Sequence, residues 1–243
     1  MLLAFIDETG DKKRKDYLGL SIAVLNGLHY PQIKRKAQNV LTAGGWAPDV
    51  EFKGAHLFSS TKGCPDVSIE QRIQIAHGLL DLNIAKQNAR MRFHFGAMAS
   101  TDPSADYLKY LPGLLHQAIG KAPKGAGKNL LAVTCDQRDD LDHDSLDLAI
   151  DEVAGSRGYV VMERVHMARS SFHTIGLMYA DIVGYLMGRI DTISTDAELF
   201  DGLTEAELAS SNAARRLRTS LDLAGKIRRL TTYSHALSPV AAA

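Results

Sequence analysis

Two apolar segments of the sequence each end in an acidic residue. The segment "LLAFID" ends on Asp7 and is followed by Glu8, and the segment "LLAVTCD" ends on Asp136. If both segments are parallel strands of one sheet, their carboxylates emerge at the same edge, beyond the carboxyl ends of the strands. Open α/β sheets build their functional sites at that edge, so this pattern predicts a site that contains paired carboxylates.

Two further acids have surroundings that suggest a function. Asp181 lies in the strongly apolar segment 173–190, where a buried carboxylate needs a cation or a hydrogen-bonding partner. The same segment carries small residues at intervals of four: Gly176, Ala180, Gly184 and Gly188. Such a ridge lets a helix approach a sheet closely and would bring Asp181 near the ends of the strands. The loop sequence "EFKG" adds Glu51 and Lys53.

Carboxylates that converge without compensating bases repel one another, and divalent cations remove that repulsion. Mg²⁺ and Mn²⁺ prefer carboxylate oxygens and water, and two ions about 4 Å apart can clamp the attacking and leaving oxygens of a phosphodiester. We therefore predict that two such ions are held by four acids: Asp7, Glu51, Asp136 and Asp181. Lys53 would orient the scissile phosphate, and Glu8 would hold an outer water or act as an extra ligand.

Each of these residues also has an ordinary structural explanation. Asp7 and Glu8 are compatible with a tight turn in which Gly10 supplies a positive φ. Asp136 could be an acid at the start of a loop, and Asp181 could be a core acid paired with an arginine. Glu51 could be an ordinary exposed acid. His173, at the start of the apolar helix, could assist proton transfer, although a histidine in that position is more often structural.

The composition describes a soluble protein without a strong charge. The chain has 243 residues with 28 basic and 28 acidic side chains, so no global electrostatic field attracts nucleic acid. Phosphate contacts would have to come from local basic runs at 12–15, 34–36 and 226–229. Two cysteines fit a reducing cytosol, and neither a signal peptide nor a membrane-spanning segment is indicated. We predict a cytoplasmic protein and leave its oligomeric state open, a homo-oligomer included.

Hydrophobic periodicity predicts one α/β domain. The expected strands are 2–7, 17–24, 90–99, 130–136 and 159–167, and the expected helices are 30–45, 68–89, 104–120, 144–154, 173–190 and 204–218. The order of these elements favours a mixed sheet flanked by helices. We place the domain at 1–190 and expect 191–243 to be a C-terminal helical extension packed on it.

Several other motifs are excluded by their details. The segment 139–152 opens like a calcium-binding loop, but Ser145 stands at the glycine position and Asp151 at the closing glutamate position. The aspartyl phosphatase pattern fails because Thr9 occupies the place of its second aspartate. The sequence contains no Walker loop, Rossmann fingerprint, paired-cysteine zinc motif or nucleophile elbow.

The segments "FIDETGD", "EFKG", "VTCD" and "LMYADIVGY" together resemble the successive motifs of a bacterial and phage family called domain of unknown function 3800, over about residues 2–190. That family is similar to the RNase H-like superfold, in which acids on the first strand, a later strand and a terminal helix hold two Mg²⁺ ions. The resemblance implies site roles for Asp7, Glu8, Glu51, Lys53, Asp136 and Asp181. Thr9 replaces the usual serine, and Met178 stands where a glutamine is common.

These observations favour a metal-dependent nuclease, or a related phosphoryl-transfer enzyme, that acts on a DNA or RNA backbone. The alternative is a non-catalytic RNase H-like module that binds a partner or nucleic acid in a phage-defence or mobile-element system. The placement of the acids favours the enzyme, whereas the neutral overall charge favours the binding module.

Overall fold

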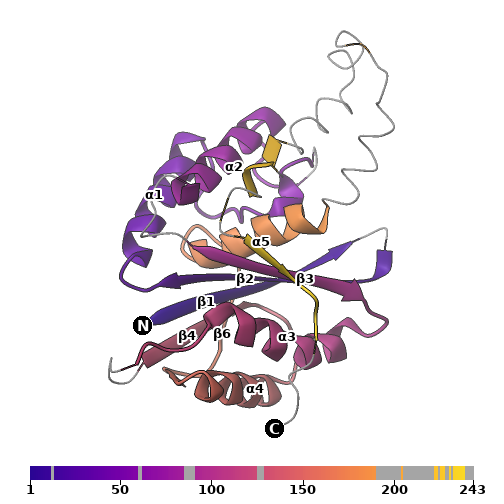
Figure 1. Cartoon of the computed structure of the whole chain (residues 1–243). Helices are drawn as coiled ribbons and strands as arrows, with labels where there is room; N and C mark the ends of the chain where they lie inside the picture. The colour runs from indigo at the N-terminus through magenta and orange to yellow at the C-terminus, as the bar shows by residue number, and fades with distance from the viewer. Residues whose placement is uncertain are drawn as a thin grey trace.

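The computed structural model describes residues 1–11, 14–59, 62–84, 91–124, 129–189, 204, 222–223, 225–227, 230 and 232–238. A mixed seven-stranded sheet forms its centre, in the order β5-β4-β1-β2-β3-β7, with β6 paired to β4 (Figure 1). The strands are β1 (Leu2–Asp11), β2 (Arg14–Asn26), β3 (Arg92–Ala99), β4 (Asn129–Asp136), β5 (Tyr159–Val161), β6 (His166–Ala168) and β7 (Thr232–His235). The predicted α/β class, with a mixed sheet flanked by helices, is confirmed.

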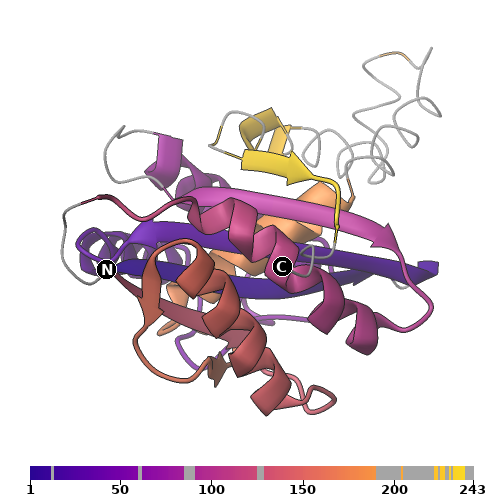
Figure 2. The ribbon, with the colours of Figure 1, turned by 60° about the horizontal axis from the view of Figure 1, so that its bottom comes forward.

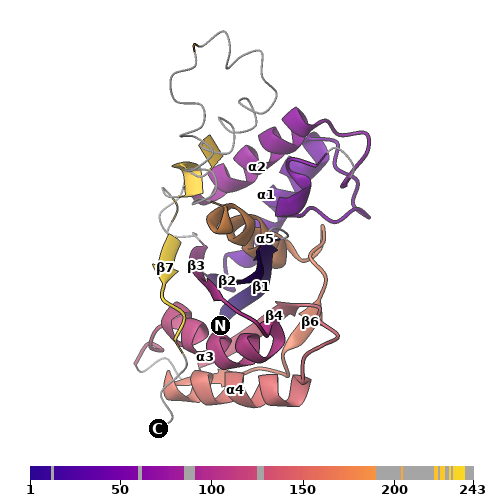
Figure 3. The same ribbon diagram turned by 90° about the vertical axis from the view of Figure 1, so that its right-hand side faces the viewer.

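Helices cover both faces of this sheet. They are α1 (Tyr30–Ala43), α2 (Ile69–Ile84), α3 (Pro103–Ile119), α4 (His143–Ser156) and α5 (Ile175–Gly188), with a short 3₁₀ helix η1 (Gly54–His56). Figure 3 shows α1, α2 and α5 on one side of the sheet and α3 and α4 on the other. Alternating side chains of β1 feed the two cores: Phe5 packs with α1, α2 and α5, whereas Ala4 and Ile6 pack with α3 and α4.

The predicted close approach of α5 to the sheet is confirmed. A Cβ atom at Gly176 would overlap the ring of Phe5, and one at Gly184 would lie 2.9 Å from the Cβ of Ser21. Only glycine leaves room for β1 and β2 to pack directly against this helix. The close packing sets the depth at which Asp181, between these two glycines, meets the sheet.

The first strand differs from the sequence prediction. β1 does not end at Asp7 but continues to Asp11, in a long hairpin with β2 in which Asp7 lies opposite Ser21 and Thr9 opposite Gly19. The segment "ETGDKKRKD" has the composition of a turn, but backbone pairing with β2 carries much of it as strand. The predicted strand 159–167 is likewise two short strands, β5 and β6.

The C-terminal part of the chain contributes a strand. β7 pairs in parallel with β3, from Phe93–Thr232 to Gly96–His235, and Figure 2 shows the two strands side by side. Residues 222–223 and 225–227 are helical, and the side chains of Leu223 and Ile227 are buried in the core on the α5 side. The predicted helix 204–218 lies outside the described residues apart from Thr204. None of the described helices is long and apolar enough to span a membrane.

Candidate metal site on the α5 face of the sheet

Asp7 and Asp136 lie side by side on neighbouring strands. The parallel ladder of β1 and β4 runs from Leu2–Leu131 to Ile6–Cys135 and stops one residue before this pair. Phe5 belongs to the core under α5 and Cys135 to the core under α3 and α4, so alternation places both carboxylates on the α5 side. Asp7 is only 5 % exposed, which is unusual for a carboxylate that is not paired with an arginine.

Asp181 meets Asp7 from the helix. The two carboxyl groups are hydrogen-bonded to each other, and the Gly54 backbone N–H at the start of η1 donates to Asp181 Oδ2. Burial raises the pKa of Asp7 well above its ordinary value, and the charges of Asp181 and Asp136 raise it further. Burial also raises the pKa of Asp181 to about 6, against the lowering effects of the Gly54 N–H and Lys53. Two carboxyl groups that share a hydrogen bond in this way hold a proton between them.

Lys53 is the cation that faces this acidic cluster. Its ammonium lies 3.1 Å from Glu51 Oε1 and 3.9 Å from Asp136 Oδ2. Burial lowers the pKa of Lys53, but Asp136, Glu51 and Asp181 outweigh burial and the net pKa is raised. The four predicted acids therefore converge on one region, and Lys53 is part of the same cluster.

A loop that is far from regular in structure presents Glu51 and Lys53. Arg72, at the start of α2, is 4 % exposed, and its guanidinium donates to five main-chain carbonyls of this loop. Those carbonyls belong to His56, Ser59, Lys62, Cys64 and Val67. The ring centre of Trp46 lies 5.9 Å from Cζ of this guanidinium, and its indole N–H donates to the Val50 carbonyl at 2.8 Å. These contacts hold the loop that carries two of the six predicted site residues.

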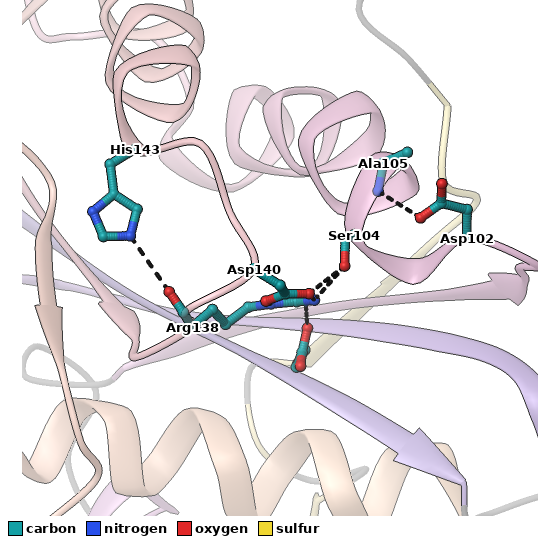
Figure 4. Close-up of polar contacts among 7 residues, drawn as sticks. Asp102, Ser104, Ala105, Arg138, Asp140 and His143 are labelled. Carbon is teal, nitrogen blue, oxygen red and sulfur yellow. Dashed lines mark hydrogen bonds and ion pairs between the residues drawn. The ribbon is translucent and has the colours of Figure 1, made fainter.

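Glu8 is separated from the other predicted residues. Because successive side chains of a strand point to opposite faces, Glu8 projects to the α3 side, where it forms an ion pair with Arg138. Asp140 and Ser104 also contact Arg138, as Figure 4 shows. The structure thus brings together Asp7, Glu51, Lys53, Asp136 and Asp181 and does not bring Glu8 to them.

Sequence reasoning missed Arg72 and Arg138. Neither belongs to a motif, and each acts through partners that are distant or irregular in sequence, such as main-chain carbonyls and Glu8. The acids of the calcium-like segment have structural partners instead. Asp140 pairs with Arg138, Asp142 caps α4, and Asp144 pairs with Arg164.

The donor set fits a hard divalent cation in its chemistry. Within the described residues, four carboxyl groups lie near the Lys53 ammonium, and even with one proton shared between Asp7 and Asp181 they leave an excess of negative charge that Mg²⁺ or Mn²⁺ would neutralise. The hydroxyl of Ser21, directly opposite Asp7, is fully buried and has no hydrogen-bond partner in the described part of the chain. Within that same part, no group of three histidine, cysteine, aspartate or glutamate side chains is gathered closely enough to hold a metal. The acids instead interact as an Asp7–Asp181 pair and a Glu51–Lys53–Asp136 group.

Comparison with known proteins gives only remote similarities. No protein-family model and no curated protein matches the sequence. Among solved structures, a chain of the PCNA:RNase HII complex from Archaeoglobus fulgidus has 14 % identity and a TM-score of 0.37, with 95 % of this chain and 93 % of that chain covered. Ribonuclease H2 from Pyrococcus horikoshii has 10 % identity and a TM-score of 0.39, with 94 % and 99 % covered. At these scores the similarity carries no argument about activity.

Proposed function

We propose that this protein is a divalent-metal-dependent nuclease, or a related phosphoryl-transfer enzyme, that acts on a DNA or RNA backbone. The observation that carries the proposal is the convergence of four acids from separate elements on one side of the sheet. Asp7 comes from β1, Asp136 from β4, Asp181 from α5 and Glu51 from the loop before η1. Functional sites of α/β enzymes commonly combine residues from several elements in this way.

Asp7, Asp136 and Asp181, with Glu51, would hold two Mg²⁺ or Mn²⁺ ions. When bound, such ions activate a water molecule and stabilise the leaving oxygen of a phosphodiester. The side chain of Lys53 is about one-third exposed and lies beside Glu51 and Asp136, so its ammonium can bind and orient a phosphate oxygen. The burial of Asp7 limits the access of water to this carboxyl group and would strengthen its interaction with a bound cation. We leave Glu8 out of the ligand set because it faces the other side of the sheet.

The second candidate is a non-catalytic module that binds a partner or nucleic acid. The interaction of Lys53 with both Glu51 and Asp136 favours it, because these contacts neutralise part of the cluster without a metal. Calorimetric titration separates the two candidates. An enzyme of the proposed kind binds Mn²⁺ and loses that binding in Asp136→Asn and Asp181→Asn, whereas the module shows no Mn²⁺ heat in either form.

The proposed activity is tested with purified protein, Mn²⁺, and labelled single- and double-stranded DNA and RNA. We expect cleavage of at least one substrate and a loss of more than about 100-fold in Asp7→Asn, beyond the effect of outer-shell changes around a metal. Asp49→Asn is the matched control, because Asp49 is an exposed acid just before the Glu51 loop. Equal cleavage by wild type and Asp7→Asn would show that the activity arises elsewhere.

A further inference from the structure

The ion pair between Glu8 and Arg138 joins two residues that each follow a proposed metal ligand. Glu8 is the residue after Asp7 in β1, and Arg138 lies two residues after Asp136, at the end of β4. The backbone ladder between β1 and β4 stops at Ile6–Cys135. Beyond that point, the Glu8–Arg138 contact is a cross-strand tie between the two segments that carry Asp7 and Asp136.

Arg138 is held from several directions. Its Nε donates to Asp140 Oδ1 at 2.9 Å, and its Nη2 lies 2.6 Å from Asp140 Oδ2 and 3.1 Å from Ser104 Oγ. The guanidinium also lies 5.0 Å from the ring centre of Tyr107 in α3, and its Nη1 contacts Glu8. The Arg138 side chain is only 10 % exposed. A planar guanidinium engaged on both edges and one face has a single favourable orientation.

The first turn of α3 completes this arrangement. Asp102 caps the helix by accepting a hydrogen bond from the Ala105 N–H at 3.1 Å, which fixes the position of Ser104 (Figure 4). The Ser104 hydroxyl then contacts both Arg138 and Asp140. Arg138 is therefore tied to α3 as well as to β1, and its place does not depend on Glu8 alone.

We propose that Arg138 is a positioning residue for the carboxylate pair on the opposite side of the sheet. It holds Glu8 against the segment after β4 and thereby fixes the separation of Asp7 and Asp136, so that Glu8 acts as the partner of Arg138 and not as a metal ligand. The consequence for metal binding rests on the proposed function, whereas the tie itself does not.

A double-mutant cycle tests this proposal with Glu8→Gln, Arg138→Met and the double variant. The first readout is the dissociation constant for Mn²⁺, measured by titration calorimetry. We expect each single variant to weaken binding by about 10-fold, in the range of outer-shell changes, and the double variant to be no weaker than either single one. Arg138→Lys keeps the positive charge but loses the planar fork, so it is expected to fold and to recover only part of the affinity.

The matched control is Arg164→Met. Like Arg138, Arg164 bridges two acids, but they are Asp144 and Asp147 of α4, and its side chain is 73 % exposed. This variant should bind Mn²⁺ as the wild type does. Abolished binding in Glu8→Gln with wild-type affinity in Arg138→Met would overturn the proposal, because that pattern marks Glu8 as a ligand. Wild-type affinity in both single variants would overturn it too.

The second readout is the midpoint temperature of thermal unfolding without metal, for the wild type, Glu8→Gln, Arg138→Met and the double variant. Coupled shifts, in which the double variant loses clearly less than the sum of the single losses, support the tie, and additive shifts overturn it. This readout remains informative if the wild type binds no Mn²⁺. In that case the proposed function fails while the tie between β1 and the segment after β4 is still tested.

Discussion

Two adjacent residues of β1, Asp7 and Glu8, lie in opposite electrostatic environments. On the α5 side, Asp7 shares its surroundings with Asp136, Asp181 and Glu51, and Lys53 is the cation that interacts with them. On the α3 side, Glu8 faces the guanidinium of Arg138, whose Nε and Nη2 contact Asp140 and Ser104. The α5 side has an excess of acids, whereas on the α3 side Glu8 and Asp140 are paired with Arg138.

This contrast separates a ligand site from a structural network. A buried carboxylate whose pKa is raised by burial and by other acids costs stability, and such costs persist where a ligand compensates for them. An acid that is paired with a well-oriented guanidinium needs no ligand. Adjacent acids in a sequence motif can therefore have different roles, because the strand sends them to different faces.

The largest expected effect comes from releasing the loop on the acid-rich side. Arg72→Met removes five hydrogen bonds to carbonyls and should lower the free energy of unfolding by about 3–5 kcal/mol, as measured by urea denaturation. Mn²⁺ binding by the folded variant should also weaken, because Glu51 and Lys53 lose their support. Arg35→Met, an exposed arginine of α1, is the control and should change stability by less than about 0.5 kcal/mol. A stable Arg72→Met variant would show that the loop is held by other contacts.

Local sequence patterns carried the prediction of the α5 side. The ridge that contains Gly176 and Gly184 predicted the contact of α5 with the sheet, and two apolar segments ending in aspartate predicted the neighbouring positions of Asp7 and Asp136. These features depend on periodicity within single segments, which the sequence displays directly.

The features that could not be predicted depend on partners far apart in the chain. Glu8 and Arg138 are brought together by the β1–β4 pairing, and no spacing in the sequence signals their contact. The continuation of β1 beyond Asp7 was missed because a polar hairpin has the composition of a turn, and only pairing with β2 distinguishes them. The contacts of Lys53 with Glu51 and Asp136 likewise follow from the path of an irregular loop.

The next effect compares the two acids of β1 directly in the metal-free protein at about pH 8. Asp7→Asn removes a carboxyl group that must be buried or protonated beside other acids when the chain folds, and its amide can donate to Asp181, so it should raise the free energy of unfolding by about 1–2 kcal/mol. Glu8→Gln removes the partner of Arg138 and should lower it by about 1 kcal/mol, a value reduced by the partial exposure of Glu8. Urea denaturation of both variants measures these changes. Shifts of the same sign would remove the distinction between the two faces.

The smallest effect concerns a buried base on the same face as Glu8. His94 of β3 is 4 % exposed, lies opposite Ile22, and its Nδ1 is 2.8 Å from Nε2 of His235 in β7. Burial, with smaller contributions from the nearby charges of His235 and Arg92, lowers the pKa of His94 from 6.5 to about 4. Between pH 6.5 and about pH 4, His94 is protonated in the unfolded chain but neutral in the folded one. The contribution of neutral His94 to stability is therefore fully present above pH 6.5 and is lost as the pH falls toward 4.

The loss attributable to His94 should be about 1 kcal/mol between about pH 6.5 and pH 5.5. Urea denaturation of the wild type and of His94→Phe at these two pH values measures it. Phe keeps an aromatic ring beside His235 but cannot be protonated, so the variant should lose about 1 kcal/mol less than the wild type over the same interval. An identical pH dependence in the two proteins would assign the loss to other groups. A smaller loss of unfolding free energy in the variant would show that the α3 side responds to pH through the buried base His94. The acids Glu8 and Asp140 on that side are already paired with Arg138.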